Sequence, residues 1–370
     1  MQYDAAITAS AFQTSLNATS LSSTTKAAIA DILDLDVADN TVVASTYNNG
    51  SFNVIVDAQG NTQTPDIAFF DNLGAAGTNA TVVIPTALAN ASTFVFDTAA
   101  NVTVAIGTAA TVTPTAAVEG AVATRAIVSG AGNDTITVRD NVNTYIDSGD
   151  GDDTIVTAGG NDTIHVGNGT NNVSAGAGND VITVGNGVHT IDGGAGFDVV
   201  NVGVSVGAYT GVTISNGTVS LASATNGNLN LTNVQFVAGT DNQSISIVNS
   251  QAEGIALRLF DAVLGRDADV GGAQFYTQQV NGGTSLSTIA NNFINSTEYT
   301  AVHGSNVSDA QFIQDIYQGA LGRTADAEGL VFWAQQLVTG HTRADVVVGI
   351  VGSAESQAHD TGVIVVTGQV

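Results

Sequence analysis

The sequence predicts a mainly β fold: a right-handed parallel β-roll or β-solenoid, followed by a small α-helical domain. The first observation is a run of Gly/Asn/Asp-rich nonapeptides, each with a β-branched residue at the same position. The second is a change, from Ala252 onward, to helix-forming residues with helical periodicity. We therefore expect three domains: a small α/β or β region over 1–80, the solenoid with capping strands over 81–248, and a helical tandem-repeat domain over 249–370.

The nonapeptide array occupies residues 129–201. Its last six units are consecutive and read SGDGDDTIV, TAGGNDTIH, VGNGTNNVS, AGAGNDVIT, VGNGVHTID and GGAGFDVVN. An earlier unit, SGAGNDTIT, begins at Ser129 and is joined to them by a degenerate stretch over 138–147. The eighth position is Ile or Val in every unit, and the first four positions are rich in Gly. The sixth position is Asp in five of the seven units, with Asn171 and His189 as the exceptions.

This pattern predicts a flattened coil of short strands and tight turns. Three residues around the apolar position form a strand that directs one side chain inward, and the Gly-rich residues reverse the chain. Two nonapeptides complete one turn, so alternate units stack at the same edge and bury an Ile/Val column. Upstream, Thr81–Val128 is expected to extend the stack, and strands over 202–248 are expected to cover its open end.

The helical segment is itself a tandem repeat of two copies. Each copy predicts a helix that ends at an LGR turn, a second helix around an aromatic pair, and a third after GxT. The matched positions include Phe260/Tyr317, Arg266/Arg323, Asp269/Asp326, Phe275-Tyr276/Phe332-Trp333, Ser296/Ser353 and Glu298/Glu355. In the N-terminal region, residues 22–33 predict a capped helix and FNVIVDA near Phe52 predicts a strand.

Charge and composition exclude several classes of function. The chain has 33 acidic and 7 basic residues, a net charge of −26, and Lys26 is its only lysine. A nucleic-acid binder or a protein bound to anionic lipid needs a basic surface, which so few cations cannot build. No uninterrupted apolar run is long enough to cross a membrane. With no cysteine, thiolate metal sites, cysteine nucleophiles and disulfides are also excluded.

The array instead has the chemistry of a calcium site. Residues 129–201 hold ten Asp and one Arg, and Ca²⁺ prefers carboxylate and carbonyl oxygens. Ordinary solvated turns are the alternative, but a bare turn does not need Asp at one fixed position. We therefore predict Ca²⁺ as the cofactor. The expected ligands are Asp134, Asp153, Asp162, Asp180, Asp198 and Asn171, with the loop glycines Gly130, Gly132, Gly149, Gly151, Gly160, Gly176, Gly178, Gly194 and Gly196.

The two edges of the coil are expected to differ in calcium occupancy. One edge carries Asp162, Asp180 and Asp198, one from every second unit. The other carries Asp134, Asp153, Asn171 and His189. We expect two tightly bound calcium ions on the first edge, one between Asp162 and Asp180 and one between Asp180 and Asp198. The second edge is expected to hold one ion between its two Asp residues, a weak one beside Asn171, and none at His189, because neutral His offers nitrogen to a cation that prefers oxygen.

Signals of catalysis are poor. Gly203-Val204-Ser205-Val206-Gly207 fits the G-x-S-x-G pattern, but that motif needs a strand–turn–helix context, and β-structure is predicted to follow it. No ligand spacing such as HExxH links the five histidines. The aromatic pairs of the helical repeats are expected mostly in the core, with stacking on sugars as the alternative. We expect no enzyme.

The nonapeptides resemble GGxGxDxUx, the calcium-binding repeat of the RTX (repeats-in-toxin) proteins, although only GGAGFDVVN has Gly at its first position. The helical segment 252–360 resembles an uncharacterised helical repeat domain found behind RTX arrays in large secreted bacterial proteins. The resemblance implies export by a type I secretion apparatus with an uncleaved C-terminal signal, in agreement with the absence of an N-terminal signal pattern. The final VIVVTGQV lacks the acidic and hydrophobic ending of some such enzymes.

These observations predict a secreted, extracellular or cell-surface structural protein that folds on calcium binding after export. It is expected to self-assemble as a surface layer or filament, so its main partner is a second copy of itself. The alternative is a monomeric RTX adhesin or glycan-binding module whose helical aromatics meet cell-surface polysaccharide. A secreted hydrolase that depends on Ser205 is a third reading.

Overall fold

The computed structural model describes residues 6–37, 39–48, 51–52, 55–57, 59–108 and 123–369. The chain forms two compact units, one made of residues 1–203 and 208–234, the other of 204–207 and 235–369. These units do not coincide with the three expected domains, whose boundaries stay predictions.

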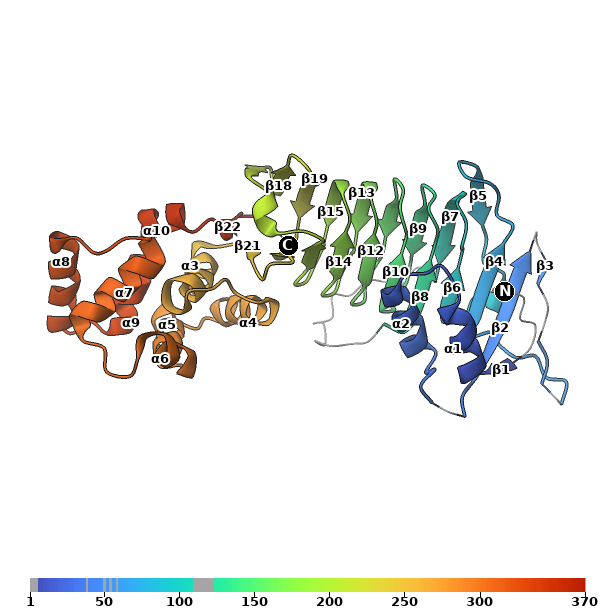
Figure 1. Cartoon of the computed structure of the whole chain (residues 1–370), viewed down its shortest axis with the longest axis horizontal. Helices are drawn as coiled ribbons and strands as arrows, with labels where there is room; N and C mark the ends of the chain where they lie inside the picture. Colours follow the sequence, from blue (N-terminus) through green and yellow to red (C-terminus); the bar gives the residue numbers. More distant parts are fainter. Residues whose placement is uncertain are drawn as a thin grey trace. The chain divides into compact units, whose positions relative to one another are not determined.

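The first unit contains two parallel sheets whose strands alternate along the chain (Figure 1). One sheet contains β2 (Thr41–Asn48), β4 (Ile67–Asp71), β6 (Thr93–Val95), β8 (Arg125–Val128), β10 (Thr144–Asp147), β12 (Thr163–Val166), β14 (Val181–Val184) and β16 (Val199–Val202). The other contains β5 (Asn79–Val82), β7 (Asn101–Ile106), β9 (Thr135–Val138), β11 (Thr154–Val156), β13 (Gly169–Ser174), β15 (Gly187–Asp192) and β19 (Gly227–Thr232). Successive nonapeptides therefore contribute to opposite sheets, which is the arrangement of a β-roll or solenoid.

The eighth position of each nonapeptide forms the core of the coil. In the first sheet, the strand register aligns Ile164 with Ile146 on one side and with Ile182 on the other. In the second sheet, Ile155 is aligned in the same way with Ile136 and Val173. All of these side chains are at most 1% exposed, so each turn covers the apolar residue of its neighbours.

The stack continues upstream of the array, as the Thr/Val-rich sequence predicts. Phe94 and Ile127 align with Ile146 in one sheet, and Val104 aligns with Ile136 in the other. Part of that predicted stretch, residues 109–122, lies outside the described residues. β5 ends the second sheet, whereas the first continues to β4 and β2.

Two N-terminal helices cover the outer face of the first sheet. The predicted helix over 22–33 is α2 (Ser23–Ile32), with Ser22 as its N-cap, and α1 (Ala9–Asn17) precedes it. Their apolar residues pack with Phe69, Val95 and Val128 of the sheet. β1 (Ala6–Thr8) and β3 (Ser51–Phe52) pair antiparallel with β2. The predicted strand near Phe52 falls partly on residues outside the described ranges.

At the other end of the second sheet, β17 (Gly211–Ser215) and β18 (Thr218–Ser223) form an antiparallel hairpin that continues into β19. Short 3-10 turns occur at η1 (Thr86–Leu88) and η2 (Val206–Ala208). The second unit adds β20 (Phe236–Ala238) and β21 (Ser244–Val248), which pair antiparallel, and β22 (Val363–Val365), parallel to β21.

The helical unit contains the two predicted copies. The first copy contains α3 (Gln251–Leu259) with the π-helical turn η3 (Phe260–Leu264), then α4 (Val270–Asn281), α5 (Leu286–Ile294) and α6 (Thr297–His303). The second contains α7 (Asp309–Leu321), α8 (Ala327–Val338), α9 (Arg343–Val351) and α10 (Ala354–His359). The copies contact each other through equivalent helices, η3 against α7 and α5 against α9. None of the described helices is long and apolar enough to span a membrane.

The fourth helix of each copy is an element that sequence reasoning missed. Ser296 caps α6 and Ser353 caps α10. The glutamate that follows pairs with the arginine of the LGR turn, with Nε–Oε1 distances of 2.6 Å for Arg266–Glu298 and 2.5 Å for Arg323–Glu355. The repeated Ser/Glu positions therefore reflect a helix cap and an ion pair.

One member of each aromatic pair is half-buried and the other is exposed. Tyr276 packs edge-on against Phe260, and the indole Nε1–H of Trp333 donates to the Tyr317 hydroxyl at 3.2 Å. The expectation of core positions is wrong for the other two members, since Phe275 is 52% and Phe332 54% exposed.

Candidate metal centre

The sixth position of each nonapeptide lies at the entrance to a strand, and these side chains form two columns. The column before β12, β14 and β16 contains Asp162, Asp180 and Asp198. The column before β9, β11, β13 and β15 contains Asp134, Asp153, Asn171 and His189. All seven are at most 1% exposed. The structure thus brings the predicted Asp residues together at the two edges, one from every second unit of the repeat.

One oxygen of each side chain is held by the backbone of the preceding turn. Oδ1 of Asp180 accepts from the Asp162 N–H at 2.7 Å, and Oδ1 of Asp198 accepts from the Asp180 N–H at 2.9 Å. In the second column, Oδ1 of Asp153 accepts from the Asp134 N–H at 2.8 Å. Each carboxylate is therefore fixed in place with one oxygen already used.

The second oxygen of several carboxylates has no such partner. Oδ2 of Asp134, Asp162 and Asp180 is buried and has no hydrogen bond to any described residue. Oδ2 of Asp153 accepts from the Ser148 hydroxyl at 2.6 Å. A buried carboxylate oxygen without a partner is costly unless the group takes up a proton or a cation. The two columns therefore offer carboxylate oxygens without hydrogen-bond partners, which are the ligands that a cation site requires.

The pKa values of these buried carboxyl groups are raised, because burial disfavours the charged form. Burial raises the pKa of Asp180 to about 9, with smaller contributions from the neighbouring charges of Asp198 and Asp162. Burial also raises the pKa of Asp162 and of Asp198 to about 7 each, that of Asp153 to about 6, and that of Asp134 above its ordinary value. At neutral pH and without a cation, the central carboxyl of the first column is protonated.

Glycine lets the loops stack directly on one another. At Gly178, which has a φ of +138°, a Cβ atom would lie 1.8 Å from the carbonyl oxygen of Gly160 in the preceding turn. Gly160 differs, because its nearest backbone neighbour is the Asn143 nitrogen at 3.0 Å. A Cβ would likewise fall within 2.5 Å of a carbonyl oxygen of the preceding turn at Gly130, Gly132, Gly149, Gly151, Gly176, Gly194 and Gly196. Loop carbonyls are therefore closely layered where the sequence predicts calcium ligands.

The end of the second column is neutral. Nε2 of His189 lies 3.1 Å from the Gly185 carbonyl oxygen, so Nε2 carries the proton and donates it. Nδ1 of His189 then accepts from the Asn171 amide at 3.3 Å. Burial lowers the pKa of His189, which favours the neutral ring. The pair satisfies itself without a cation, in line with the predicted difference between the edges, which stays a prediction.

An outer ladder of Asn and Asp side chains also joins the turns, at positions that sequence reasoning did not assign. The Asn161 Oδ1 atom accepts from the Asn179 N–H, and Asn179 Oδ1 accepts from the Phe197 N–H, each at 2.9 Å. Asp152 makes the same bond with the Thr170 N–H at 2.7 Å on the other edge. The signal was the fifth position of the nonapeptide, which is often Asn or Asp directly before the buried Asp. This ladder links the turns without a cation.

Across the described ranges, no group of three or more His, Asp or Glu side chains converges in a way that could hold a metal ion. An ion between two turns would therefore need loop carbonyls in addition to the stacked carboxylates. Residues 140–173 and 165–200 match the family described as the RTX calcium-binding nonapeptide repeat (4 copies). The chain contains RTX repeats.

RTX repeats bind calcium, so calcium is the cofactor of this array. They are typical of secreted proteins that leave the cell by type I secretion. The RTX match begins at residue 140, so the unit with Asp134 lies outside it and is placed in the column by geometry alone. Residues 249–301 and 290–359 match a domain of unknown function, DUF4214, which confirms the second resemblance. No curated protein and no solved structure is significantly similar to the chain.

The G-x-S-x-G pattern has a different environment from a nucleophile elbow. The Ser205 hydroxyl donates to the Asp241 carboxylate, and only the short turn η2 follows. The two matches suggest a structural or binding protein, and no catalytic family is among them.

Proposed function

We propose that this RTX protein is a secreted structural protein whose right-handed β-roll folds on binding calcium after export, and which then self-assembles outside the cell as a surface layer or filament. The observation that carries the calcium part is the buried Asp162–Asp180–Asp198 column, in which Oδ2 of Asp162 and of Asp180 has no partner among the described residues. Without a cation these groups oppose folding at neutral pH, and extracellular calcium supplies the missing charge.

The proposed ligands are those of the sequence pattern. Tightly bound calcium ions lie between Asp162 and Asp180 and between Asp180 and Asp198, and a third calcium ion lies between Asp134 and Asp153. The proposed carbonyl ligands are supplied by Gly130, Gly132, Gly149, Gly151, Gly160, Gly176, Gly178, Gly194 and Gly196, with Asn171 as a weak side-chain ligand. Calcium here supplies positive charge and additional coordination between turns, while the chain positions the oxygens and excludes water from the column.

Circular dichroism of the whole chain tests the folding step. Addition of EGTA is expected to remove most of the β-signal of the calcium-loaded protein, and millimolar calcium is expected to restore it. A β-signal that survives excess EGTA unchanged contradicts calcium-dependent folding, whatever the state of assembly.

Self-assembly is supported by a difference between the two helical copies. In the first copy, α4 contacts β20, and Ala273 and Gln274 are buried. In the second copy, α8 has no buried residue. The position equivalent to buried Gln274 is Val331, which is 69% exposed. A position that is polar where it is buried and apolar where it is exposed is expected if another surface covers it in the second copy.

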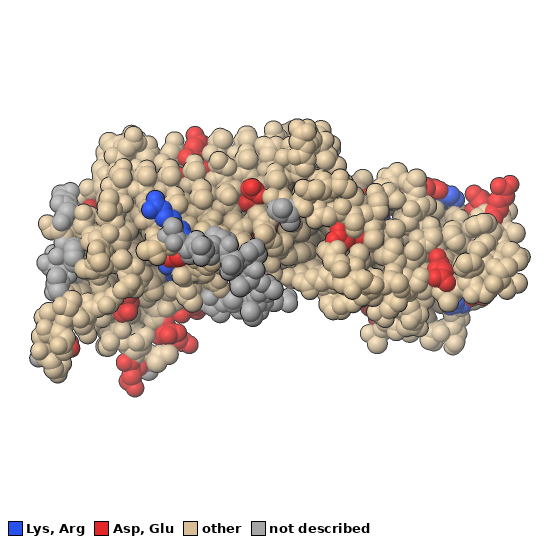
Figure 2. Space-filling model, turned by 180° about the vertical axis from the view of Figure 1, so that it is seen from behind, with Lys and Arg blue, Asp and Glu red and all other residues tan. Residues whose placement is uncertain are grey.

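We infer that a second copy of this chain covers α8. Glu328 is the only charged residue of the helix, so two α8 faces can meet without the repulsion expected elsewhere in a chain of net charge −26. In the view of Figure 2, uncharged residues dominate the drawn surface of each unit, with only scattered charged side chains. Low charge density favours repeated packing of identical molecules.

Electron microscopy and light scattering at millimolar calcium test this step. We expect polymers for the native chain and a strong loss of association for Val331→Lys. Val302→Lys is the matched control, because Val302 on α6 is 55% exposed and gains the same charge. A monodisperse native protein, or equal effects of the two substitutions, contradicts assembly through α8.

A second candidate function is a glycan-binding module. It is favoured by the exposure of Phe275 and Phe332 at equivalent positions of the two copies, because exposed rings can stack on sugars. Monodisperse particles with an affinity for neutral polysaccharide, lost in Phe275→Ala and Phe332→Ala, would favour this alternative.

A further inference from the structure

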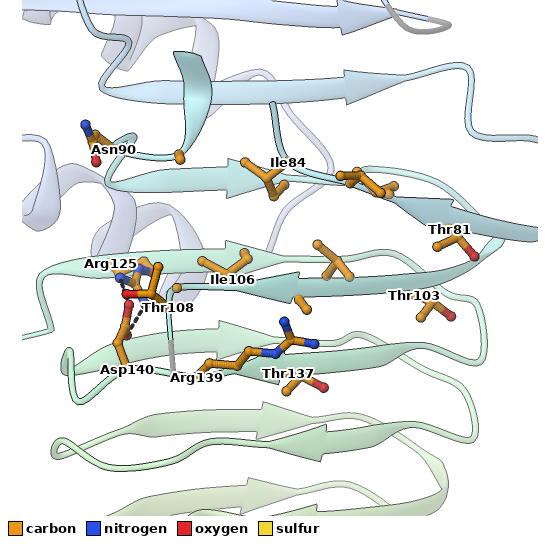
Figure 3. A pocket seen from close by; sticks show the side chains of 16 residues that line it. Thr81, Ile84, Asn90, Thr103, Ile106, Thr108, Arg125, Thr137, Arg139 and Asp140 are labelled. Atoms are coloured by element: carbon orange, nitrogen blue, oxygen red, sulfur yellow. Dashed lines mark hydrogen bonds and ion pairs between the residues drawn. The ribbon is translucent and has the colours of Figure 1, made fainter. Parts of the chain in front are cut away.

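The strands upstream of the RTX array form an open cavity of about 670 Å³ (Figure 3). Its lining comes from β5, β7 and β9, from the segments that follow these strands, and from Arg125 at the start of β8. The volume lies within the range of about 300–1,000 Å³ that is usual for small-ligand sites. None of the proposed calcium ligands lines it, so its role is separate from that of the RTX turns.

The cavity contains a basic side chain that has no partner among the described residues. The guanidinium of Arg139 has no hydrogen bond or ion pair to any residue that the structure describes, although its backbone N–H donates to the Ile106 carbonyl; the other six basic side chains of the chain each have at least one partner. These bonds are made by Lys26, Arg125, Arg258, Arg266, Arg323 and Arg343. In a protein with 33 acidic residues, an arginine left free in a cavity is notable because carboxylate partners are abundant.

The neighbouring carboxylate is already neutralised. Asp140 forms a bidentate pair with Arg125, with Nη1–Oδ1 and Nη2–Oδ2 distances of 2.8 and 2.9 Å. Asp140 also packs against Gly107, where a Cβ would lie 2.1 Å from Oδ2. Figure 3 shows the Arg139 side chain extending along its strand toward Thr137, away from Asp140. The titratable residues that line the cavity therefore leave one positive charge, which Arg139 carries.

The rest of the lining is uncharged. Threonine side chains from three neighbouring strands, Thr81, Thr103 and Thr137, offer hydroxyl groups, and Asn90 offers an amide. Thr81 and Thr103 are paired in the strand register, so their hydroxyls repeat at the strand spacing of about 4.8 Å. Ile84 adds a half-buried apolar surface. This lining suits a ligand with several hydroxyl groups and some apolar surface.

We propose that this cavity binds an acidic sugar, with Arg139 pairing with its carboxylate. A guanidinium binds a carboxylate through two parallel hydrogen bonds, and one free charge matches one carboxylate better than a phosphate chain. The threonine hydroxyls and the Asn90 amide take the hydroxyl groups of the sugar, and the apolar surface takes a ring face. Because Arg139 is exposed, the affinity is modest and falls as salt is added.

Isothermal titration of the calcium-loaded full chain tests the proposal. The probe is a disaccharide of glucuronic acid and glucose, and cellobiose is its neutral counterpart. We expect cellobiose, and the acidic disaccharide with Arg139→Gln, to bind at least tenfold more weakly than the acidic disaccharide binds the native chain. Arg139→Lys, which keeps the charge but loses the two-pronged donor, is expected to be intermediate. Arg323→Gln removes the same charge in the helical unit and is expected to leave binding unchanged.

Equal binding of the neutral and acidic disaccharides would overturn the proposal, as would no binding of the acidic one. Binding that survives Arg139→Gln would point to the calcium ions and would also overturn it. If acetate competes for the cavity as well as the disaccharide does, the cavity recognises only the carboxylate, and the proposal of a sugar ligand is wrong. Arg139→Gln is expected to fold normally, which circular dichroism checks, because the Arg139 side chain has no bond to any described residue and the substitution keeps its backbone bond to Ile106.

Discussion

The central carboxylate of the first column is the sharpest test of the calcium mechanism. Asp180→Asn keeps the Oδ1 acceptor for the Asp162 N–H and removes only the charge. In the calcium-free protein the native carboxyl must be protonated, whereas Asn is already neutral. In the calcium-loaded protein the same change removes one carboxylate from each of two proposed ions. We therefore expect Asp180→Asn to stabilise the calcium-free fold and to destabilise the calcium-bound fold.

The structure sets the scale of both effects. Burial raises the pKa of Asp180 from 3.8 to about 9, so at pH 7 its protonation in the fold costs on the order of 4 kcal/mol, from about three pH units at about 1.4 kcal/mol each. Removing this cost is the expected gain in EGTA. In calcium, a tenfold loss of affinity at each of two sites costs about 3 kcal/mol. The two effects are comparable in size and opposite in sign.

Circular dichroism measures the two effects, as the fraction of the β-signal that remains in EGTA and as the melting temperature in millimolar calcium. Asp152→Asn is the matched control, because Asp152 makes the same kind of Oδ1 bond from an exposed position. We expect it to change neither quantity much. For Asp180→Asn, a β-signal in EGTA no larger than that of the native chain, or a melting temperature in calcium that does not fall, would refute the reasoning.

Three further predictions follow from the same columns. The calcium-free chain should gain β-structure as pH falls from about 9 toward 4, because carboxyl groups with a raised pKa, Asp180 above all, bind protons on folding. Circular dichroism in calcium-free buffer across this range checks the sign, and a loss of β-signal on acidification contradicts it. Gly178→Ala should destabilise the roll by several kcal/mol, since φ is positive there and the new Cβ meets the Gly160 carbonyl; unchanged urea unfolding would be the contrary result. A high-resolution map with calcium should show stronger density beside Asp180 than at His189, and equal density at both edges would rule out the proposed asymmetry.

Much of the calcium-binding array could be predicted from the sequence because its period is short and strict. The Ile/Val column, the alternation of units between two edges and the buried sixth position all follow from the nonapeptide repeat. The helical copies were predictable for the same reason, since the LGR turn and the aromatic pair of the first copy recur in the second. A repeat constrains each unit through identical neighbours, so local pattern and tertiary packing agree.

The remaining features depend on contacts between residues far apart in sequence. Nothing in the local pattern around Arg139 distinguishes it from a paired arginine. Its guanidinium has no partner among the described residues, because Asp140 is held by Arg125 from the preceding strand of the other sheet. Likewise, Val331 is an apolar residue that the helical pattern places in the core. The packing shows that it is exposed, because α4 contacts β20 whereas no residue of α8 is buried. The sequence by itself determined the repeat, the turns and the chemistry of the calcium ligands, because each is written within one or two units. Tertiary structure decided which charges are neutralised and which apolar faces remain open, because pairing and burial depend on the elements that fold against a residue.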